Sequence, residues 1–226
     1  MANMKKYSDM GAIGHLCAHY ERSVQPGHYG NADIDQARLS EDRVNLAPTR
    51  TNGQTAYIKQ QIAAVMDGKK LRKDAVRMCS WVVTVPENFP KEKEQEFFRA
   101  AYDFLVERYG SKSGMGEDCV ISAYIHQSET TPHLHFAFLP IMERDGKKTF
   151  CAKEAVNRTD LTTFHRDLAE YMDAKGICKK SDILNGKTKR DDTGRALTVR
   201  QLKRSEDDRW TRSRTNDRER GRDKWS

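Results

Sequence analysis

The residues best suited to chemistry lie between positions 125 and 140, where the sequence reads IHQSETTPHLHFAFLP. Three of the chain's seven histidines, His126, His133 and His135, fall within ten residues there, with Glu129 among them. Neutral imidazole is a good ligand for Mn, Zn, Ni or Co, and three imidazoles on one surface leave coordination positions open. The alternative is a set of unconnected histidines on a solvated sheet face. Their close spacing beside a carboxylate favours a metal site.

The flanking residues predict how these side chains are positioned. Residues 119–126 have the near-alternation of a β-strand, QSETTP reads as a polar turn, and residues 133–141 read as a second strand. Residues i and i+2 of a strand project from one face, so His133 and His135 share a face. If the strands pair as an antiparallel hairpin, His126 lies opposite or near His133. The three imidazoles then converge.

Two familiar metal-site patterns do not fit. The sequence contains no H-E-x-x-H, which argues against a zincin protease. The H-x-H of a cupin is followed closely by a ligand glutamate, whereas the next glutamate here is Glu143, eight residues on and beyond Pro140. The class of enzyme therefore has to be inferred from other features of the chain.

The composition indicates a polyanionic partner. The 226 residues, with a mass of 26.0 kDa, carry a formal net charge of +7 and a pI near 9.1. Charged side chains make up 32% of the chain and hydrophobic ones only 37%. Nucleic acid is the natural partner of such a basic protein.

The cysteines and the N-terminus indicate the compartment. The five cysteines are odd in number, scattered and form no C-x-x-C, which favours a reducing cytoplasm over zinc ribbons or a disulfide framework. The N-terminal residues lack the apolar stretch of a signal peptide, and no segment approaches the length of a membrane span. We therefore expect a cytoplasmic protein.

Periodicity predicts the elements around the histidine hairpin. Strands are expected over residues 12–23 and 78–86, and helices over 54–67, 91–109 and 159–176. The helices are expected to end at Gly68, Gly110 and Gly176, and Thr159 or Asp160 is expected to cap the last one. This order predicts an α+β fold with a central antiparallel sheet flanked by helices.

The character of the sequence changes after about residue 185. Residues 185–226 carry many charges of both signs and few apolar side chains, so this segment cannot bury enough surface to fold alone. We expect one domain over residues 1–184 and a charged tail over residues 185–226, partly helical or disordered.

A basic surface beside a three-histidine metal site suggests metal-dependent phosphodiester chemistry. Such an enzyme also needs a nucleophile, either an activated water or a side chain. The sequence H-Y-E-R, residues 19–22, stands at the end of the first predicted strand. It is followed by N-A-D-I-D-Q-A-R at 31–38 and R-K-D-A-V at 72–76.

Together with H-x-x-E-x-T-P-H-x-H at 126–135, these motifs occur in an order that resembles the Mob/Pre plasmid-mobilisation relaxases, the MobV family of HUH endonucleases. The resemblance covers roughly residues 10–180. It implies a sheet of about five antiparallel strands flanked by helices, with the metal histidines on central strands. It also implies an enzyme that nicks one DNA strand at an origin of transfer and stays covalently attached to the 5′ phosphate.

The resemblance assigns the nucleophile to the histidine of an N-terminal H-x-x-R motif, which is His19 here. Tyr20 lies directly beside it, and most relaxases attack with tyrosine. On a strand the two side chains point to opposite faces, so only one can face the metal. We expect His19, because imidazole has a lone pair available near neutral pH whereas a phenol with a pKa of about 10 must first lose its proton.

The remaining site residues are given roles by the chemistry. A divalent metal, with Mn²⁺ favoured over Mg²⁺ by three nitrogen ligands, polarises the scissile phosphate. Glu129 is expected to accept a hydrogen bond from a ligand imidazole or to take the nucleophile's proton, unless it is an ordinary exposed turn carboxylate. Arg22 and Arg72 are expected to hold phosphate oxygens, with a surface ion pair as the alternative for Arg22.

The expected partner is DNA, as a single strand beside a duplex or hairpin at the origin of transfer. Lys69, Lys70 and Lys73 are expected to line its path as point charges, and Asn31 and Arg38 to contact it as well. A coupling protein of a conjugation system is a second expected partner.

Five other residues with suggestive chemistry are expected to be structural or bystanders. Phe136 and Phe138 alternate with the histidine face and should lie in the core, and Tyr57 should pack within its helix. His15 and His28 have no evident partner.

Two rival classes remain open. A hydrolase that attacks with water would need the three metal histidines but not His19. A DNA-binding module with a structural metal fits less well, because structural zinc is normally four-coordinate and no fourth ligand is evident.

Overall fold

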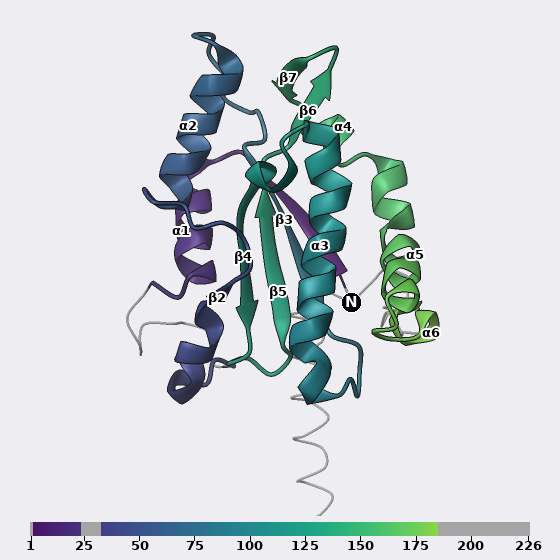
Figure 1. The fold of residues 1–226 in the computed structure, drawn as a ribbon. Helices are drawn as coiled ribbons and strands as arrows, with labels where there is room; N and C mark the ends of the chain where they lie inside the picture. The colour runs from purple at the N-terminus through teal and green to yellow at the C-terminus, as the bar shows by residue number, and fades with distance from the viewer. Residues whose placement is uncertain (1, 24–32, 185–226) are drawn as a thin grey trace, which may run out of the picture. The chain divides into compact units, whose positions relative to one another are not determined.

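A five-stranded antiparallel sheet organises the computed structural model, which describes residues 2–23 and 33–184 (Figure 1). The strand order is β1-β3-β5-β4-β2, and every pairing is antiparallel. The strands are β1 (Ala2–Tyr7), β2 (Val44–Asn45), β3 (Met78–Thr84), β4 (Val120–His126) and β5 (His133–Phe138). A separate two-stranded hairpin joins β6 (Ile141–Arg144) to β7 (Lys147–Phe150). The predicted α+β class is confirmed.

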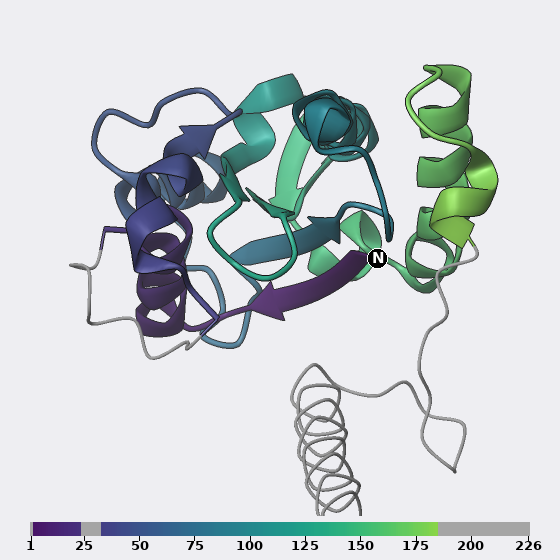
Figure 2. The same cartoon turned by 90° about the horizontal axis from the view of Figure 1, so that it is seen from below.

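Helices cover both faces of the sheet, as the view along it shows (Figure 2). One face is covered by α1 (Met10–Tyr20) and α2 (Gln54–Met66), and the other by α3 (Glu94–Ser113) and α5 (Arg158–Ala174). Short helices complete the described part: η1 (Gln36–Arg43), η2 (Lys91–Lys93), η3 (Gly116–Cys119), α4 (Ala152–Ala155) and α6 (Lys180–Leu184). None of the helices within these ranges has the length and apolar character needed to cross a membrane.

The alternation of β5 separates a core face from a polar face. Leu134, Phe136 and Phe138 are fully buried in the larger core beneath α3 and α5. Ala137 packs in the smaller core beneath α1 and α2, on the same face as the two histidines of this strand. The expected core positions of the two phenylalanines are confirmed.

The prediction of a strand over residues 12–23 is wrong, because this segment forms α1. Asp9 caps the helix by accepting a hydrogen bond from the Ala12 backbone N–H at 2.8 Å. Ile13, Cys17 and Tyr20 are the buried residues of α1, and their spacing of four and three is that of one helix face. The strand that the sequence analysis missed is β1, which lies at the edge of the sheet and has only half-buried and exposed residues.

Glycine and cap positions explain the other differences from the predicted boundaries. α3 continues through Gly110 and ends at Gly114, which has φ 60°. Gly110 is needed inside the helix because a Cβ there would lie 2.7 Å from the Gly116 carbonyl oxygen. α5 is capped by Asn157, not by Thr159 or Asp160. The expected stops near Gly68 and Gly176 agree with the ends of α2 and α5.

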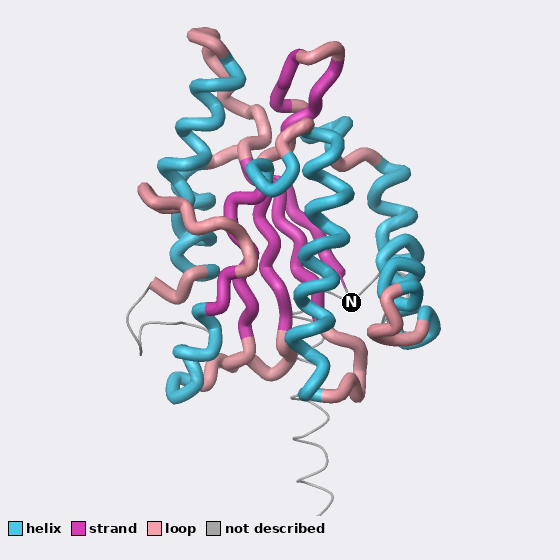
Figure 3. The backbone as a smooth tube through the Cα atoms, in the orientation of Figure 1, coloured by secondary structure: helices cyan, strands magenta, loops and turns pink. Residues whose placement is uncertain are grey.

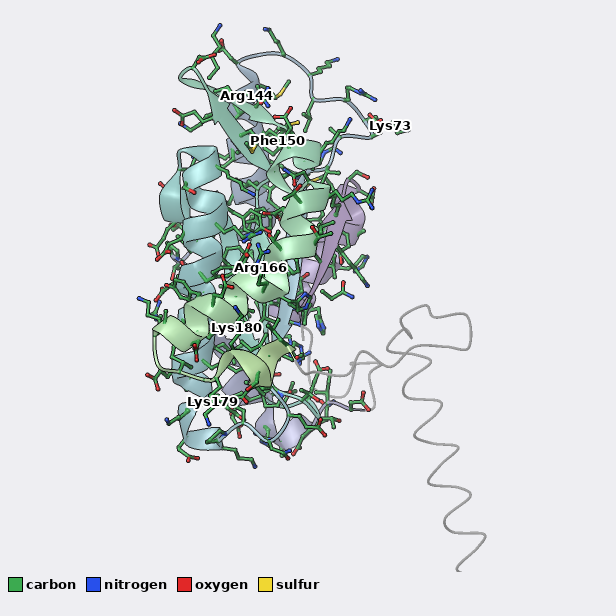
Figure 4. The ribbon with its side chains drawn as sticks, turned by 90° about the vertical axis from the view of Figure 1, so that its right-hand side faces the viewer. Lys73, Arg144, Phe150, Arg166, Lys179 and Lys180 are labelled. Carbon is green, nitrogen blue, oxygen red and sulfur yellow. The ribbon has the colours of Figure 1, made fainter. Side chains whose placement is uncertain are left out.

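The two ends of the sheet carry different features. The turn between β4 and β5 lies at one end, and the β6–β7 hairpin lies at the other (Figure 3). Lys73, which precedes β3, lies toward the same end as Arg144 and Phe150 of the hairpin (Figure 4). Because a strand rises about 3.3 Å per residue, the six residues of β5 separate the two ends by on the order of 20 Å. The predicted tail lies outside the described residues, so the boundary at residue 184 stays a prediction.

Candidate metal centre

The register of the central hairpin brings the three histidines together. His126 at the end of β4 is paired directly with His133 at the start of β5. His135 projects from the same face, and the centroids of the three rings lie 4.5 to 5.3 Å apart. All three residues are buried, with exposed fractions of 0, 9 and 7%. The two strands therefore hold a compact imidazole cluster, named here the histidine cluster, beneath α1.

Hydrogen bonds fix which nitrogens keep their lone pairs. The Nε2 of His126 lies 2.9 Å from the Tyr20 carbonyl oxygen, so it carries the proton and leaves Nδ1 as an acceptor. The Nδ1 of His133 likewise donates to the Thr131 carbonyl oxygen at 2.8 Å, which leaves its Nε2 as an acceptor. This Nε2 lies 3.0 Å from Nε2 of His135. In that hydrogen bond Nε2 of His135 is the donor, which leaves its Nδ1 as an acceptor.

Two buried nitrogens of the cluster, Nδ1 of His126 and Nδ1 of His135, form no hydrogen bond. Buried polar atoms in proteins nearly always have a partner, so orphaned ones call for a ligand. The carboxylate of Glu129 lies 3.5 Å from Nδ1 of His126. A bound cation would give the orphaned nitrogens a partner.

Burial favours the neutral forms of His133 and His135, because it disfavours the charged imidazolium. It lowers the pKa of His133 and lowers that of His135 well below its ordinary value. Neutral imidazole is the form that binds metals. These two imidazoles therefore have lone pairs available to bind a cation near neutral pH.

Two overlapping groups of side chains have ligand atoms within 4.8 Å of one another. The first contains His19, His126 and His135, and the second contains His126, Glu129 and His133. His126 belongs to both groups. Neither group contains all three predicted metal histidines, since His126 shares one group with His135 and the other with His133.

α1 delivers His19 to the cluster. Its ring centroid lies 5.1 Å from that of His126 and 5.3 Å from that of His135. Burial, followed by the neighbouring His126 and Arg22, lowers the pKa of His19 to about 4. The imidazole is therefore uncharged at neutral pH and has a lone pair to offer.

Tyr20 is also close, which the strand-based argument did not foresee. Successive residues of a helix are about 100° apart around the axis, so neighbours are not sent to opposite faces. The Tyr20 ring stacks on His135 with centroids 4.5 Å apart, and its hydroxyl bonds the Ser80 Oγ at 2.9 Å. Burial raises the pKa of this phenol. Tyr20 thus packs beneath the cluster as a protonated, hydrogen-bonded side chain.

Arg22 links the end of α1 to the hairpin. Its Nη2 donates to Glu129 Oε1 and its Nε to Asp42 Oδ2, both at 2.7 Å, and its Nη1 lies 3.4 Å from Nδ1 of His19. Arg22 is only 4% exposed, so the alternative of a surface ion pair does not describe it. Its φ of 50° is a left-handed conformation that costs a non-glycine residue about 1 kcal/mol, and the ion pairs hold it there.

Glu129 is not an ordinary turn carboxylate, because its side chain is only 16% exposed and contacts Arg22. Burial alone would raise its pKa, but its contacts with His126 and Arg22 outweigh burial and lower the pKa to about 2. The carboxylate is therefore ionised at any pH at which the protein would work. A carboxylate this acidic is a weak proton acceptor.

Other predicted site residues lie away from the cluster. Arg72 is exposed and pairs with Asp74 at 2.7 Å. Lys69, Lys70 and Lys73 are exposed in the same segment. This segment precedes Met78, which begins β3 at the end of the sheet opposite the histidines. The structure therefore does not bring Arg72 to the histidine cluster, since the length of β3 lies between them.

The remaining expectations fall in three places. Arg38 is exposed on η1 and pairs with Glu41, while Asn31 and His28 lie outside the described residues. Tyr57 packs on α2, where its hydroxyl donates to the Asp118 carbonyl oxygen. His15 is exposed on α1, with no role evident there.

Asp42 is a residue of this site that sequence reasoning missed. It is fully buried at the end of η1 and contacts both Arg22 and the turn after β4. The segment S-E-D-R around it is polar and ordinary in composition, so no sequence signal marks it.

The fold of the described residues is similar to that of a relaxase domain. The MobM relaxase domain, in a Mn-bound crystal structure with plasmid pMV158 oriT DNA, aligns with 91% of this chain and 97% of its own. The TM-score is 0.72 and the sequence identity 27%. A second structure of that domain with 23-nucleotide oriT DNA gives a TM-score of 0.68 at 26% identity, over 91% of this chain and 96% of its own.

The family model named Mob_Pre, plasmid recombination enzyme, matches residues 1–194, and the chain belongs to this family. A plasmid recombination enzyme of Streptococcus agalactiae is 28% identical over 84% of this chain and 37% of its own length. A type 3 plasmid recombination enzyme of Staphylococcus aureus is 32% identical over 66% of this chain and 35% of its own. The chain spans a little over a third of the length of these relatives.

Proposed function

We propose that this domain nicks one DNA strand at a plasmid origin of transfer by metal-assisted transesterification, with His19 as the nucleophile. The observation that carries the proposal is the buried histidine cluster, with two orphaned imidazole nitrogens, directly beside an uncharged His19. Phosphoryl transfer needs a nucleophile, an electrophilic group at the phosphate and a charge partner for the transition state. His19 would be the nucleophile, the histidine cluster would hold the electrophilic metal, and Arg22 would be the charge partner.

The residues fit a divalent cation. His126, His133 and His135 would hold it, because their buried rings lie 4.5 to 5.3 Å apart and Nδ1 of His126 has no hydrogen-bond partner. When bound, the metal polarises the scissile phosphate and neutralises its charge. The MobM domain is Mn-bound, and three nitrogen ligands also favour Mn²⁺ over Mg²⁺ here.

His19 would form the covalent bond. Its nitrogen bonds to phosphorus as the bond from phosphorus to the 3′ oxygen breaks. The 3′ oxygen leaves with a proton, the imidazole loses its N–H proton, and the 5′ phosphate stays on His19 as a phosphoramidate. Arg22 lies within 3.4 Å of His19 and would stabilise the charge on the attacked phosphate.

Glu129 would act as a fixed charge and not as a base. Its pKa of about 2 makes proton transfer to it unfavourable near neutral pH. Its contacts with Arg22 and His126 instead hold the guanidinium against the hairpin. Water or the departing 3′ oxygen would take up the proton.

The DNA would extend past the cluster toward the basic end of the sheet. Residues 67–77 hold five basic and two acidic side chains. We infer that Lys69, Lys70 and Lys73, and with them Arg72, contact phosphates distant from the nick. Replacing Lys69 and Lys70 by alanine should weaken binding and flatten its salt dependence by about two counterions. Lys180→Ala, on α6 and paired with Glu170, is the matched control and should change neither.

The proposed setting is the reducing cytoplasm, because all five cysteines lie in the described residues as free thiols. Asn31 and Arg38 remain proposed DNA contacts, and a conjugation coupling protein a proposed partner.

The test is incubation of the protein with a single-stranded oligonucleotide that spans the origin, with Mn²⁺ or with EDTA. A band that resists boiling in a denaturing gel, and forms only with metal, is expected. Free cleaved product without an adduct would instead establish the rival function, a metal-dependent hydrolase that attacks with water. Full nicking in EDTA would refute the metal site.

A further inference from the structure

Asp42 occupies a place where three segments of the chain meet. It stands at the end of η1 with an exposed fraction of 0%. Arg22, which follows α1, lies on one side of its carboxylate, and Gln127 and Ser128, which follow β4, lie on the other. The side chain therefore connects the helix that bears the nucleophile to the turn that carries the metal residues.

Both oxygens of the carboxylate are fully engaged. Oδ1 accepts the backbone N–H groups of Gln127 and Ser128 at 2.6 and 2.8 Å. Oδ2 accepts the Arg22 Nε–H at 2.7 Å and the Ser128 hydroxyl. A buried charge is tolerated only when it is paired and hydrogen-bonded, and this one is both. Such a site specifies a carboxylate and not merely a polar residue.

The contact with Asp42 fixes the plane of the guanidinium. Its Nε edge is held by Asp42, and Nη2 then meets Glu129 while Nη1 faces His19. Without the first contact, the long arginine side chain would have only its outer nitrogens restrained. A guanidinium that must meet a phosphate in one orientation is sensitive to such a change.

We propose that Asp42 is a positioning residue of the nicking reaction, which orients Arg22 toward His19 and ties α1 to the turn at residues 126–129. It touches neither DNA nor metal in this account and acts through Arg22. The inference rests on the proposed function.

The substitution that separates orientation from structure is Asp42→Asn. The amide oxygen can still accept both backbone N–H groups in place of Oδ1, so the turn stays supported. The amide N–H₂ then faces the Arg22 Nε–H, donor against donor, and that contact is lost. Ser128→Ala is the matched control, because it removes one hydrogen bond to the same carboxylate and leaves Arg22 untouched.

The experiment measures single-turnover adduct formation with an origin oligonucleotide and Mn²⁺ over a range of DNA concentrations. Asp42→Asn should lower the limiting rate by about 10- to 100-fold, since small misplacements of a catalytic group have effects of this size. The DNA concentration at half-maximal rate should stay unchanged. Ser128→Ala should stay within about threefold of the wild-type rate. A wild-type limiting rate for Asp42→Asn would overturn the proposal.

A double-mutant cycle distinguishes an effect through Arg22 from a general loss of structure. In an Arg22→Gly background, Asp42→Asn should cause no further loss. A full additional loss would assign Asp42 a purely structural role and overturn the proposal. Should Asp42→Asn fail to fold, Arg22→Lys replaces it, because lysine keeps the charge but cannot contact Asp42 and Glu129 as one fork. A wild-type rate for Arg22→Lys would overturn the proposal too.

The proposed function and the positioning role of Asp42 can be refuted separately. If the wild-type protein forms no adduct under any condition, the nicking activity itself is refuted. If the wild-type protein forms the adduct and Asp42→Asn forms it equally fast, only the positioning role is refuted.

Discussion

Two clusters of arginine and carboxylate groups lie in different parts of this domain and differ in what surrounds them. The site cluster is Arg22, Asp42 and Glu129, next to α1. The helix cluster lies between α3 and α5, where Arg108 and Lys112 contact Asp160, and Arg108 also contacts Asp167. In the helix cluster, Asp160 accepts on both oxygens, and the Tyr109 hydroxyl that donates to it accepts from Trp81.

The difference indicates what each cluster is for. The charged groups of the helix cluster pair with one another and connect α3 to α5, as the members of a structural hydrogen-bond network do. The site cluster borders two orphaned imidazole nitrogens, and its Arg22 has a left-handed backbone conformation. Unsatisfied groups and backbone strain in one place are typical of a site that completes itself with a ligand.

The largest expected effect follows from removing the metal ligands. Replacing His126, His133 or His135 by alanine, or adding EDTA, should reduce adduct formation below detection, and only the EDTA effect should be reversed by Mn²⁺. Isothermal titration with Mn²⁺ checks the ligand assignment, because each variant should bind far more weakly while circular dichroism stays native. Undiminished Mn²⁺ binding by all three variants would contradict it.

The second-largest effect is expected from Arg22→Gly, which separates the catalytic role of the side chain from the backbone strain at this position. The variant should lose about 100-fold or more in nicking rate. Its stability should fall less than that of Arg22→Ala, by about 1 kcal/mol, since glycine adopts a φ of 50° without strain. Urea melts of both variants measure this difference, and equal stabilities would remove the strain argument.

Asp160→Asn tests the helix cluster. Because it weakens a buried ion pair, it should destabilise the domain by about 3 kcal/mol. The nicking rate per folded molecule should stay at the wild-type value. A variant of normal stability with impaired nicking would reverse the roles that we assign to the two clusters.

Glu129→Gln tests the site cluster through pH. The carboxyl group has a folded pKa of about 2, below its ordinary value of 4.5, so it contributes stability above pH 4.5 that is lost as the pH falls toward 2. In EDTA, the wild-type protein should therefore lose stability across this window more steeply than Glu129→Gln. Parallel curves for the two proteins would contradict the ionised state of Glu129.

The smallest effect is expected from Tyr20→Phe, which removes the hydroxyl that bonds Ser80. The loss should be about 1 kcal/mol in stability, because the Ser80 hydroxyl is left buried with one partner fewer. Adduct formation should persist. Thermal melts and the gel assay together check both halves of this expectation.

Local patterns in the sequence predict the histidine hairpin, but they do not predict the segments of the chain that contact it. Strict alternation in HLHFAF placed the histidines on one face and the phenylalanines on the other, because a strand has a period of two. In α1, small residues such as Gly11, Ala12 and Gly14 blur the apolar period, which hid the helix that Ile13, Cys17 and Tyr20 form.

Contacts between distant residues explain the rest. Asp42 meets Ser128 across 86 positions, and no short-range pattern encodes such a contact. Arg72 stands in a motif that resembles one of the family, but motif order does not say at which end of a strand a residue lies. His19 was found by resemblance, and its place beside the cluster depends on a helix that the periodicity did not predict.

The central claim is that His19 carries the DNA, and the most direct test is mass spectrometry of the trapped adduct after proteolysis. We predict that the oligonucleotide maps to His19, that the bond is cleaved by mild acid as a phosphoramidate is, and that the adduct is absent from His19→Ala but present in Tyr20→Phe. An acid-stable adduct on Tyr20 that persists in His19→Ala would contradict this account.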